Sequence, residues 1–175
     1  FGDREATYAA FAERVGRLAA GLLDLGLEPG DRVLLYLPNR PELVETLWAT
    51  LWAGLVTVPV NWHLHPEEIR YVVGHCGARA ILVDGATDAV AETLPQGPDR
   101  PLVLHADGTR GTDLRSVAGP DGAPVLHSPA EVHADDPAWL FYTSGTTGRP
   151  KRATHIAFLA PTMLHRLVEA QENER

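Results

Sequence analysis

The sequence predicts an α/β fold, a mainly parallel sheet with helices on both of its faces. Short apolar runs, such as 33–37 and 80–83, alternate along the chain with longer segments in which apolar residues recur every three or four positions. Strands that are apolar throughout belong to sheets covered on both faces, and strands that alternate with helices pair in parallel. Ligands of such sheets bind at the carboxyl ends of the strands.

The first helix is expected between Thr7 and Gly26. Thr7 is a suitable N-cap, and Gly26 stands where a glycine commonly follows the last helical turn. The spacings of the apolar face between them are those of one side of a helix. This face consists of Phe11, Val15, Leu18, Leu22 and Leu25.

A second helix is expected at 41–53 and a third at 66–76. Both begin with proline, which suits a first helical turn because its missing N–H has no intrahelical partner there. Trp48 and Trp52, one turn apart, are expected in the core or at a contact between subdomains. A short helix is expected at 87–94.

Strands are expected at 32–37, 56–60, 80–83, 102–104 and 139–141. Pro59 indicates that the second of them is an edge strand or ends there. The region from Asp107 to Asp136 is rich in Gly, Pro, Asp and Ser, which indicates a surface excursion with one short helical or strand piece near 114–117. After Lys151 a brief extended segment is expected, and then a helix whose apolar residues are Leu159, Met163, Leu164, Leu167 and Val168.

Composition excludes several classes of function. With 175 residues, 45% hydrophobic and 22% charged, the chain has the make-up of a soluble globular domain. Its net charge of −8 provides no basic surface for nucleic acid or for an anionic membrane. No apolar run approaches the ~20 residues of a membrane span, and the first residues are too polar for a signal peptide. The single cysteine, Cys76, excludes an internal disulfide and favours the cytoplasm.

The chemistry is expected in the stretch Tyr142–Lys151, which reads Y-T-S-G-T-T-G-R-P-K after a buried apolar strand. Its glycines allow tight turns and bring backbone N–H groups close to an anion. Its hydroxyls suit phosphate and Mg²⁺, and Lys151 adds a positive charge. The spacing differs from that of a Walker loop, where the lysine directly follows the last glycine. A solvated Ser/Thr/Gly-rich turn is the alternative that composition alone leaves open.

This stretch resembles the phosphate-loop signature of the adenylate-forming superfamily, which includes acyl-CoA synthetases, adenylation domains of peptide synthetases and luciferases. The family pattern is approximately Y-T-S-G-T-T-G-x-P-K-G, and the chain matches it through Lys151. The resemblance extends from about Thr7 to His155 and is greatest to acyl-CoA synthetases. The further similar segments are Thr7-Tyr8, Gly26–Val33, Leu37–Asn39, Ala53-Gly54, Val58–Asn61 and Leu64–Glu68.

The resemblance implies a two-step reaction. A carboxylate attacks the α-phosphorus of Mg-ATP to give an acyl-adenylate and pyrophosphate, and a thiol, usually that of coenzyme A, then takes the acyl group. It implies phosphate contacts from Thr146, Thr147 and Lys151, with Thr146 also a candidate contact to Mg²⁺ through ATP. His155 either approaches the acyl or phosphate site or is a loop or core histidine. The nucleotide-binding set implied by the resemblance is Thr143, Ser144, Gly145, Thr146, Thr147, Gly148 and Lys151.

Two departures from the family pattern bear on activity. Arg152 stands where the family has glycine, so either the backbone there is ordinary or the loop is altered. The run from Lys151 to His155 looks about two residues shorter than usual, which leaves the register of His155 open.

Several family motifs are not located in the chain. They are the adenine pocket, the acidic Mg²⁺ residue, the ribose-binding aspartate, the hinge, and the mobile C-terminal domain with its catalytic lysine. Residues 1–175 are therefore expected to be a partial N-terminal AMP-binding domain, the incomplete N-terminal part of an adenylate-forming large domain, with its phosphate loop at 142–151. No catalytic residue is assigned, and the isolated chain is not expected to catalyse.

Other functions are kept as alternatives. The missing motifs favour a catalytically inactive remnant that binds nucleotide or acts as an interaction module. An unrelated phosphate-binding protein of the same fold class is a weaker alternative. His63 and His65 are spaced as metal ligands, but no third ligand is evident. Cys76 is more typical of a small buried apolar residue than of a nucleophile.

Overall fold

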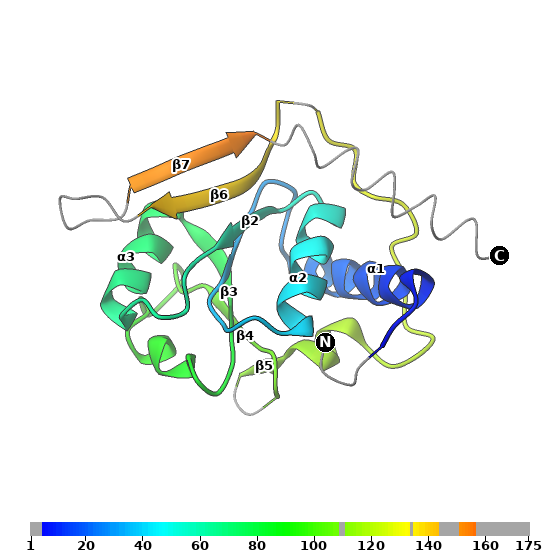
Figure 1. Ribbon diagram of the computed structural model, residues 1–175, viewed down its shortest axis with the longest axis horizontal. Helices are drawn as coiled ribbons and strands as arrows, with labels where there is room; N and C mark the ends of the chain where they lie inside the picture. The colour runs from blue at the N-terminus through cyan, green and yellow to red at the C-terminus, as the bar shows by residue number, and fades with distance from the viewer. Residues whose placement is uncertain (1–4, 109–110, 134, 144–150, 157–175) are drawn as a thin grey trace.

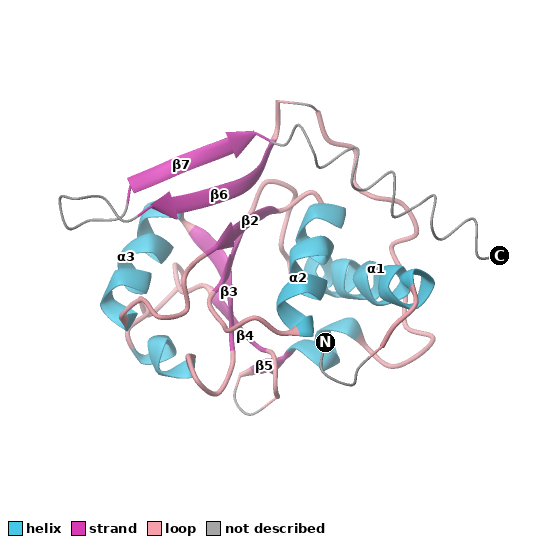
Figure 2. Ribbon diagram, in the orientation of Figure 1, coloured by secondary structure: helices cyan, strands magenta, loops and turns pink. Residues whose placement is uncertain are grey.

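The computed structural model describes residues 5–108, 111–133, 135–143 and 151–156, and for 143 and 151–156 it describes the backbone only. These residues form a seven-stranded sheet in the order β5-β4-β3-β1-β2-β6-β7, with helices on both faces (Figure 1, Figure 2). Strands β1 to β6 pair in parallel, and β7 pairs antiparallel with β6. The predicted α/β class is confirmed.

The five expected strands and the three expected long helices are all present. Pro59 is the last residue of β2, an internal strand, so of the two alternatives for this proline the strand end is right. The helix expected from Leu159 to Val168 lies outside the described residues. The strands are β1 Arg32–Leu35, β2 Val56–Pro59, β3 Ala78–Val83, β4 Leu102–His105, β5 Thr112–Asp113, β6 Pro137–Thr143 and β7 Lys151–Ile156. The helices are α1 Tyr8–Asp24, α2 Pro41–Trp52, α3 Pro66–Cys76, the 3-10 helix η1 Asp88–Glu92 and α4 Leu114–Ala118.

The ends of α1 and α3 lie where the sequence marks them. The hydroxyl of Thr7 accepts a hydrogen bond from the Ala10 N–H at 3.1 Å, as an N-cap does. Gly26 and Gly77 follow α1 and α3 with φ of 86° and 62°, a region that strains any residue with a side chain.

The sheet separates two apolar cores. On β1, Val33 and Leu35 face the core beneath α1 and α2, whereas Leu34 faces the core beneath α3 and η1. This alternation is the two-residue period of a strand. Trp52 is fully buried in the first core, and Trp48 is partly buried and packs against it, so of the two expected alternatives the core contact is right.

The excursion from 107 to 136 contains more structure than predicted. The expected short piece near 114–117 is confirmed as α4, whereas β5 was not expected. The segment after α4 crosses the first two helices: the Leu126 N–H donates to the Gly16 carbonyl at 3.1 Å, and the Ala130 N–H donates to the Trp52 carbonyl at 2.8 Å. These contacts are made by the backbone with distant partners, which composition does not reveal.

β6 is less buried than predicted. Leu140 is buried against α3, but Phe141 on the opposite face of the strand is 37% exposed. The ring of Phe141 stacks on Trp139 at a centroid distance of 5.6 Å. A run of apolar residues predicts burial on both faces only for an interior strand, and β6 lies next to the edge of the described sheet.

Candidate functional site

The phosphate-loop stretch begins at the end of β6 and ends at the start of β7, and these two strands lie side by side (Figure 1). β6 ends at Thr143 and β7 begins at Lys151, and these two residues form the last pair of the antiparallel ladder. The pairing makes the two ends of the stretch neighbours. Outside the description lie the residues Ser144, Gly145, Thr146, Thr147 and Gly148 and the side chains of Thr143, Lys151 and His155.

Both departures from the family pattern fall on β7. Arg152 lies opposite Tyr142 in the ladder, and no described residue other than glycine has a positive φ. The backbone at Arg152 is therefore ordinary extended structure, the first of the two possibilities. His155 lies opposite Trp139, four positions along β7 from Lys151. At about 3.4 Å per residue, the backbone of His155 is roughly 14 Å from that of Lys151.

An ion-pair network around Arg40 connects the carboxyl ends of β1, β3 and β4. Nε of Arg40 lies 2.8 Å from Glu42 Oε2, and its Nη1 lies 3.1 Å from Asp84 Oδ2 and 3.9 Å from Asp107 Oδ2. Burial lowers the pKa of Arg40, but hydrogen bonds and charges from Glu42 and Asp84 outweigh it and raise the pKa above its ordinary value. At this part of the sheet's carboxyl edge, the charged side chains are therefore paired with one another.

His63 and His65, whose spacing suits metal ligands, lie in the loop after β2 and have other contacts there. The ring of His63 lies against that of Trp62 at 3.8 Å. Nδ1 of His65 accepts the Glu67 N–H at 3.3 Å, and the Glu68 carboxylate accepts the His65 N–H at 2.9 Å. His65 is therefore the N-cap of α3, in a capping box that the sequence analysis missed. Across the described residues, no three His, Cys, Asp or Glu side chains are arranged to hold a metal ion.

Tyr142, the first residue of the phosphate-loop stretch, is held by α3. Its Oη lies 2.8 Å from Nδ1 of His75, and the two rings meet edge to face at 5.7 Å. Tyr71, one turn earlier on α3, stacks with the same imidazole at 5.4 Å. Burial raises the pKa of the neighbouring Cys76 thiol, and a hydrogen bond with Tyr142 is among the weaker effects that oppose the rise. Cys76 is buried, as expected of an apolar role.

Sequence reasoning did not find His75. Its partner follows 67 positions later in the chain, and no local pattern connects a histidine near a helix end with a distant strand. The only sequence signal is the spacing of Tyr71 and His75, which places both on one side of α3.

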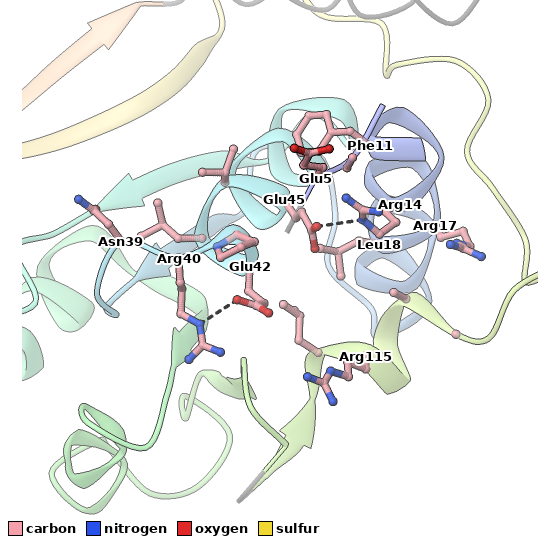
Figure 3. A pocket seen from close by; sticks show the side chains of 17 residues that line it. Glu5, Phe11, Arg14, Arg17, Leu18, Asn39, Arg40, Glu42, Glu45 and Arg115 are labelled. Atoms are coloured by element: carbon pink, nitrogen blue, oxygen red, sulfur yellow. Dashed lines mark hydrogen bonds and ion pairs between the residues drawn. The ribbon is translucent and has the colours of Figure 1, made fainter. Parts of the chain in front are cut away.

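A cavity of about 850 Å³ lies away from this turn, between α1, α2 and α4 (Figure 3). Two ion pairs join charged side chains on its walls. Nε of Arg14 lies 2.9 Å from Glu45 Oε1, and the Arg40–Glu42 pair lies at the other end. Because these walls carry both signs of charge, the cavity is a poor candidate for a polyphosphate site.

Comparisons with known proteins identify the family of the chain and support the fold described above. The model of the AMP-binding enzyme family matches residues 1–157, which include the whole phosphate-loop stretch. The chain belongs to the AMP-binding enzyme family. Its relatives in this family are CoA ligases and other adenylate-forming enzymes.

Over the matched part, individual relatives are about a third or more identical to this chain. Feruloyl-CoA synthase of an Amycolatopsis species is 40% identical over 153 residues, 87% of this chain and 28% of that protein. Triostin synthetase I of Streptomyces triostinicus is 38% identical over 150 residues, 83% of this chain and 27% of that protein. The chain therefore spans less than a third of the length of these relatives.

Solved structures support the same assignment. The anthranilate CoA ligase AuaEII, in complex with anthranoyl-AMP, has a TM-score of 0.79 and 25% identity over 88% of this chain and 30% of its own. MbtA of Mycobacterium smegmatis has a TM-score of 0.78 and 32% identity over 90% of this chain and 30% of its own. Within the described part of the chain, no helix has the length and apolar character needed to cross a membrane.

Proposed function

We propose that the protein containing this chain is an ATP-dependent carboxylate–CoA ligase. It joins a carboxylic acid to AMP with release of pyrophosphate and then transfers the acyl group to the thiol of coenzyme A. The proposal is carried by the Tyr142–Lys151 stretch, whose ends are paired by β6 and β7, in a member of the AMP-binding enzyme family. Residues 1–175 form the N-terminal part of its AMP-binding domain. A cytoplasmic location, which the single Cys76 favours, belongs to the proposal.

In this proposal the stretch surrounds the β- and γ-phosphates of ATP while negative charge develops on the leaving pyrophosphate. Backbone N–H groups and the hydroxyls of Thr146 and Thr147 donate to phosphate oxygens, and Lys151 supplies positive charge. Thr143, Ser144, Gly145 and Gly148 complete the loop.

Mg²⁺ fits this set of donors, because it prefers oxygen ligands and Thr146 offers one beside those of ATP. The ion neutralises phosphate charge when bound. His155 stays a proposed substrate-side residue.

The decisive experiment is Lys151→Ala in the full-length protein, with Arg149→Ala as the matched control. Both variants remove one cation from the same stretch, but Arg149 occupies the variable position of the family pattern. ATP–pyrophosphate exchange over a panel of carboxylic acids should fall about 10²- to 10³-fold in Lys151→Ala and change little in the control. Mass spectrometry of the CoA thioester reports the second step. Unchanged turnover in Lys151→Ala contradicts the proposal.

A catalytically inactive nucleotide-binding or interaction module is the second candidate. The observation that favours it is Arg152, where the family pattern has glycine directly after the lysine. An inactive module predicts ATP binding by the full-length protein without exchange for any acid. Measurable ATP–pyrophosphate exchange refutes this candidate.

A further inference from the structure

Tyr142 and Thr143, where the phosphate-loop stretch begins, lie at the end of β6 that does not pair with an interior strand of the described sheet. One ladder pair, Thr57 with Trp139, joins β6 to β2 among the described residues. From Leu140 to Thr143, the strand that β6 pairs with is β7, which itself lies at the edge of the described sheet. Backbone pairing to the rest of the sheet therefore does not fix the position of Tyr142 and Thr143.

A side chain supplies the missing attachment. Figure 1 shows the carboxyl end of β6 beside α3, and there the Tyr142 hydroxyl meets His75 Nδ1 at 2.8 Å. Tyr142 also packs against the apolar core beneath α3. The imidazole is itself oriented, because the ring of Tyr71 stacks with it. α3 is the rigid element in this contact, since Ile69 and Val72 on it are fully buried in the core.

We propose that His75 is a positioning residue for the phosphate loop. Its hydrogen bond with Tyr142, the first residue of the stretch, sets the position of β6 next to the ladder pair Thr143–Lys151. His75 acts through Tyr142 and needs no contact with ATP. This inference rests on the proposed function of the stretch, because it specifies what holds that stretch in place for nucleotide binding.

Four variants of the full-length protein isolate the hydrogen bond. Tyr142→Phe removes the hydroxyl and keeps the ring. His75→Phe keeps a ring beside Tyr71 and removes the hydrogen bond, whereas His75→Asn restores a polar atom near the place of Nδ1. The double variant Tyr142→Phe/His75→Phe tests whether the two residues act through one another. Arg70→Ala is the control, because Arg70 lies on the same helix and pairs with Glu67.

The first readout does not depend on activity. Hydrogen–deuterium exchange of backbone amides in β7 should be about three- to ten-fold faster in both phenylalanine variants, the range of one hydrogen bond. Because the Tyr142 hydroxyl also hydrogen-bonds Cys76, Tyr142→Phe can show the larger increase of the two single variants. The double variant should then show the same increase as Tyr142→Phe alone, and His75→Asn should approach the rate of the unsubstituted protein. Unchanged exchange in the single variants, or increases that multiply in the double variant, overturns the inference.

The second readout separates positioning from general damage. In ATP–pyrophosphate exchange, the KM for ATP should rise about three- to ten-fold in Tyr142→Phe and His75→Phe, while the KM for the acid stays constant. An equal rise in both KM values overturns the positioning role. If the unsubstituted protein shows no exchange reaction but β7 responds as expected, the ligase function fails while the attachment through His75 stands.

Discussion

β3 and β6 belong to the same parallel sheet, but they are held in different ways. β3 pairs with β1 on one side and with β4 on the other, at four register positions each, and its last four side chains are fully buried. β6 shares one register position with β2, and on its exposed face lies Phe141. The strand that makes the fold stable and the strand that carries the phosphate-loop stretch are thus different strands.

The residues that follow β3 and β6 at their carboxyl ends are also held in different ways. β3 leads into Asp84, whose carboxylate is held by Arg40 from the loop after β1. β6 leads directly into the glycine-rich stretch, and Tyr142 at its end is held by side-chain hydrogen bonds with His75 and Cys76 on α3. A ligand-binding turn needs backbone groups that are not already engaged by the protein. Under the proposed function the stretch after β6 serves as this turn, whereas the carboxylate that follows β3 is already paired with Arg40.

The largest effect that this comparison predicts is in the centre of the sheet. Leu82→Ala should lower the free energy of unfolding by about 2–5 kcal/mol, because it removes a fully buried side chain from β3 and leaves a cavity. Leu102→Ala on the neighbouring β4 is the matched control, since Leu102 is 36% exposed and its loss should cost less than about 1 kcal/mol. Urea unfolding monitored by circular dichroism measures both. Equal losses in the two variants would contradict the assignment of Leu82 to the buried core of the sheet.

A smaller loss of stability is expected from a substitution of Arg40, at the carboxyl ends of β1 and β3. Arg40→Ala leaves the carboxylates of Glu42 and Asp84 in place with their side chains 9% and 8% exposed. Breaking such a pair should lower the free energy of unfolding by about 2–3 kcal/mol, below the value for full burial because Arg40 itself is 24% exposed.

The control for Arg40 is a substitution in an exposed ion pair. Arg70→Ala breaks a pair with Glu67 in which both side chains are more than half exposed, and it should change the unfolding free energy by no more than about 0.5 kcal/mol. Chemical denaturation at low and moderate salt distinguishes the two sites, because salt screens exposed pairs more than buried ones. A loss at Arg40 as small as that at Arg70 would mean that the carboxyl edge of β1 and β3 does not depend on this network.

Much of the interior could be predicted from the sequence because it is encoded locally. The cap at Thr7, the glycines after α1 and α3, and the apolar runs of β1 and β3 each mark their own element. Two-residue β5 carries too little pattern to recognise, and the segment after α4 is held by backbone contacts. The candidate site likewise has a part that the local sequence predicts and a part that it does not. The order of residues from Tyr142 to Lys151 indicates phosphate binding, whereas Arg40 and His75 depend on partners that only folding brings near.

The smallest effect is expected at the exposed face of β6, and it can sharpen the comparison. Phe141→Ala in the isolated chain should lower the free energy of unfolding by about 1 kcal/mol, because the ring is 37% exposed and its described aromatic contact is the stack on Trp139. The same substitution in the full-length protein measures whether other parts of that protein cover this face.

A loss of about 3 kcal/mol or more in the full-length protein would mean that β6 becomes an interior strand there. A loss of that size already in the isolated chain would contradict the contrast between β3 and β6. An unchanged small loss in both would mean that the strand before the phosphate-loop stretch keeps an exposed face, so that its position depends on α3 and β7.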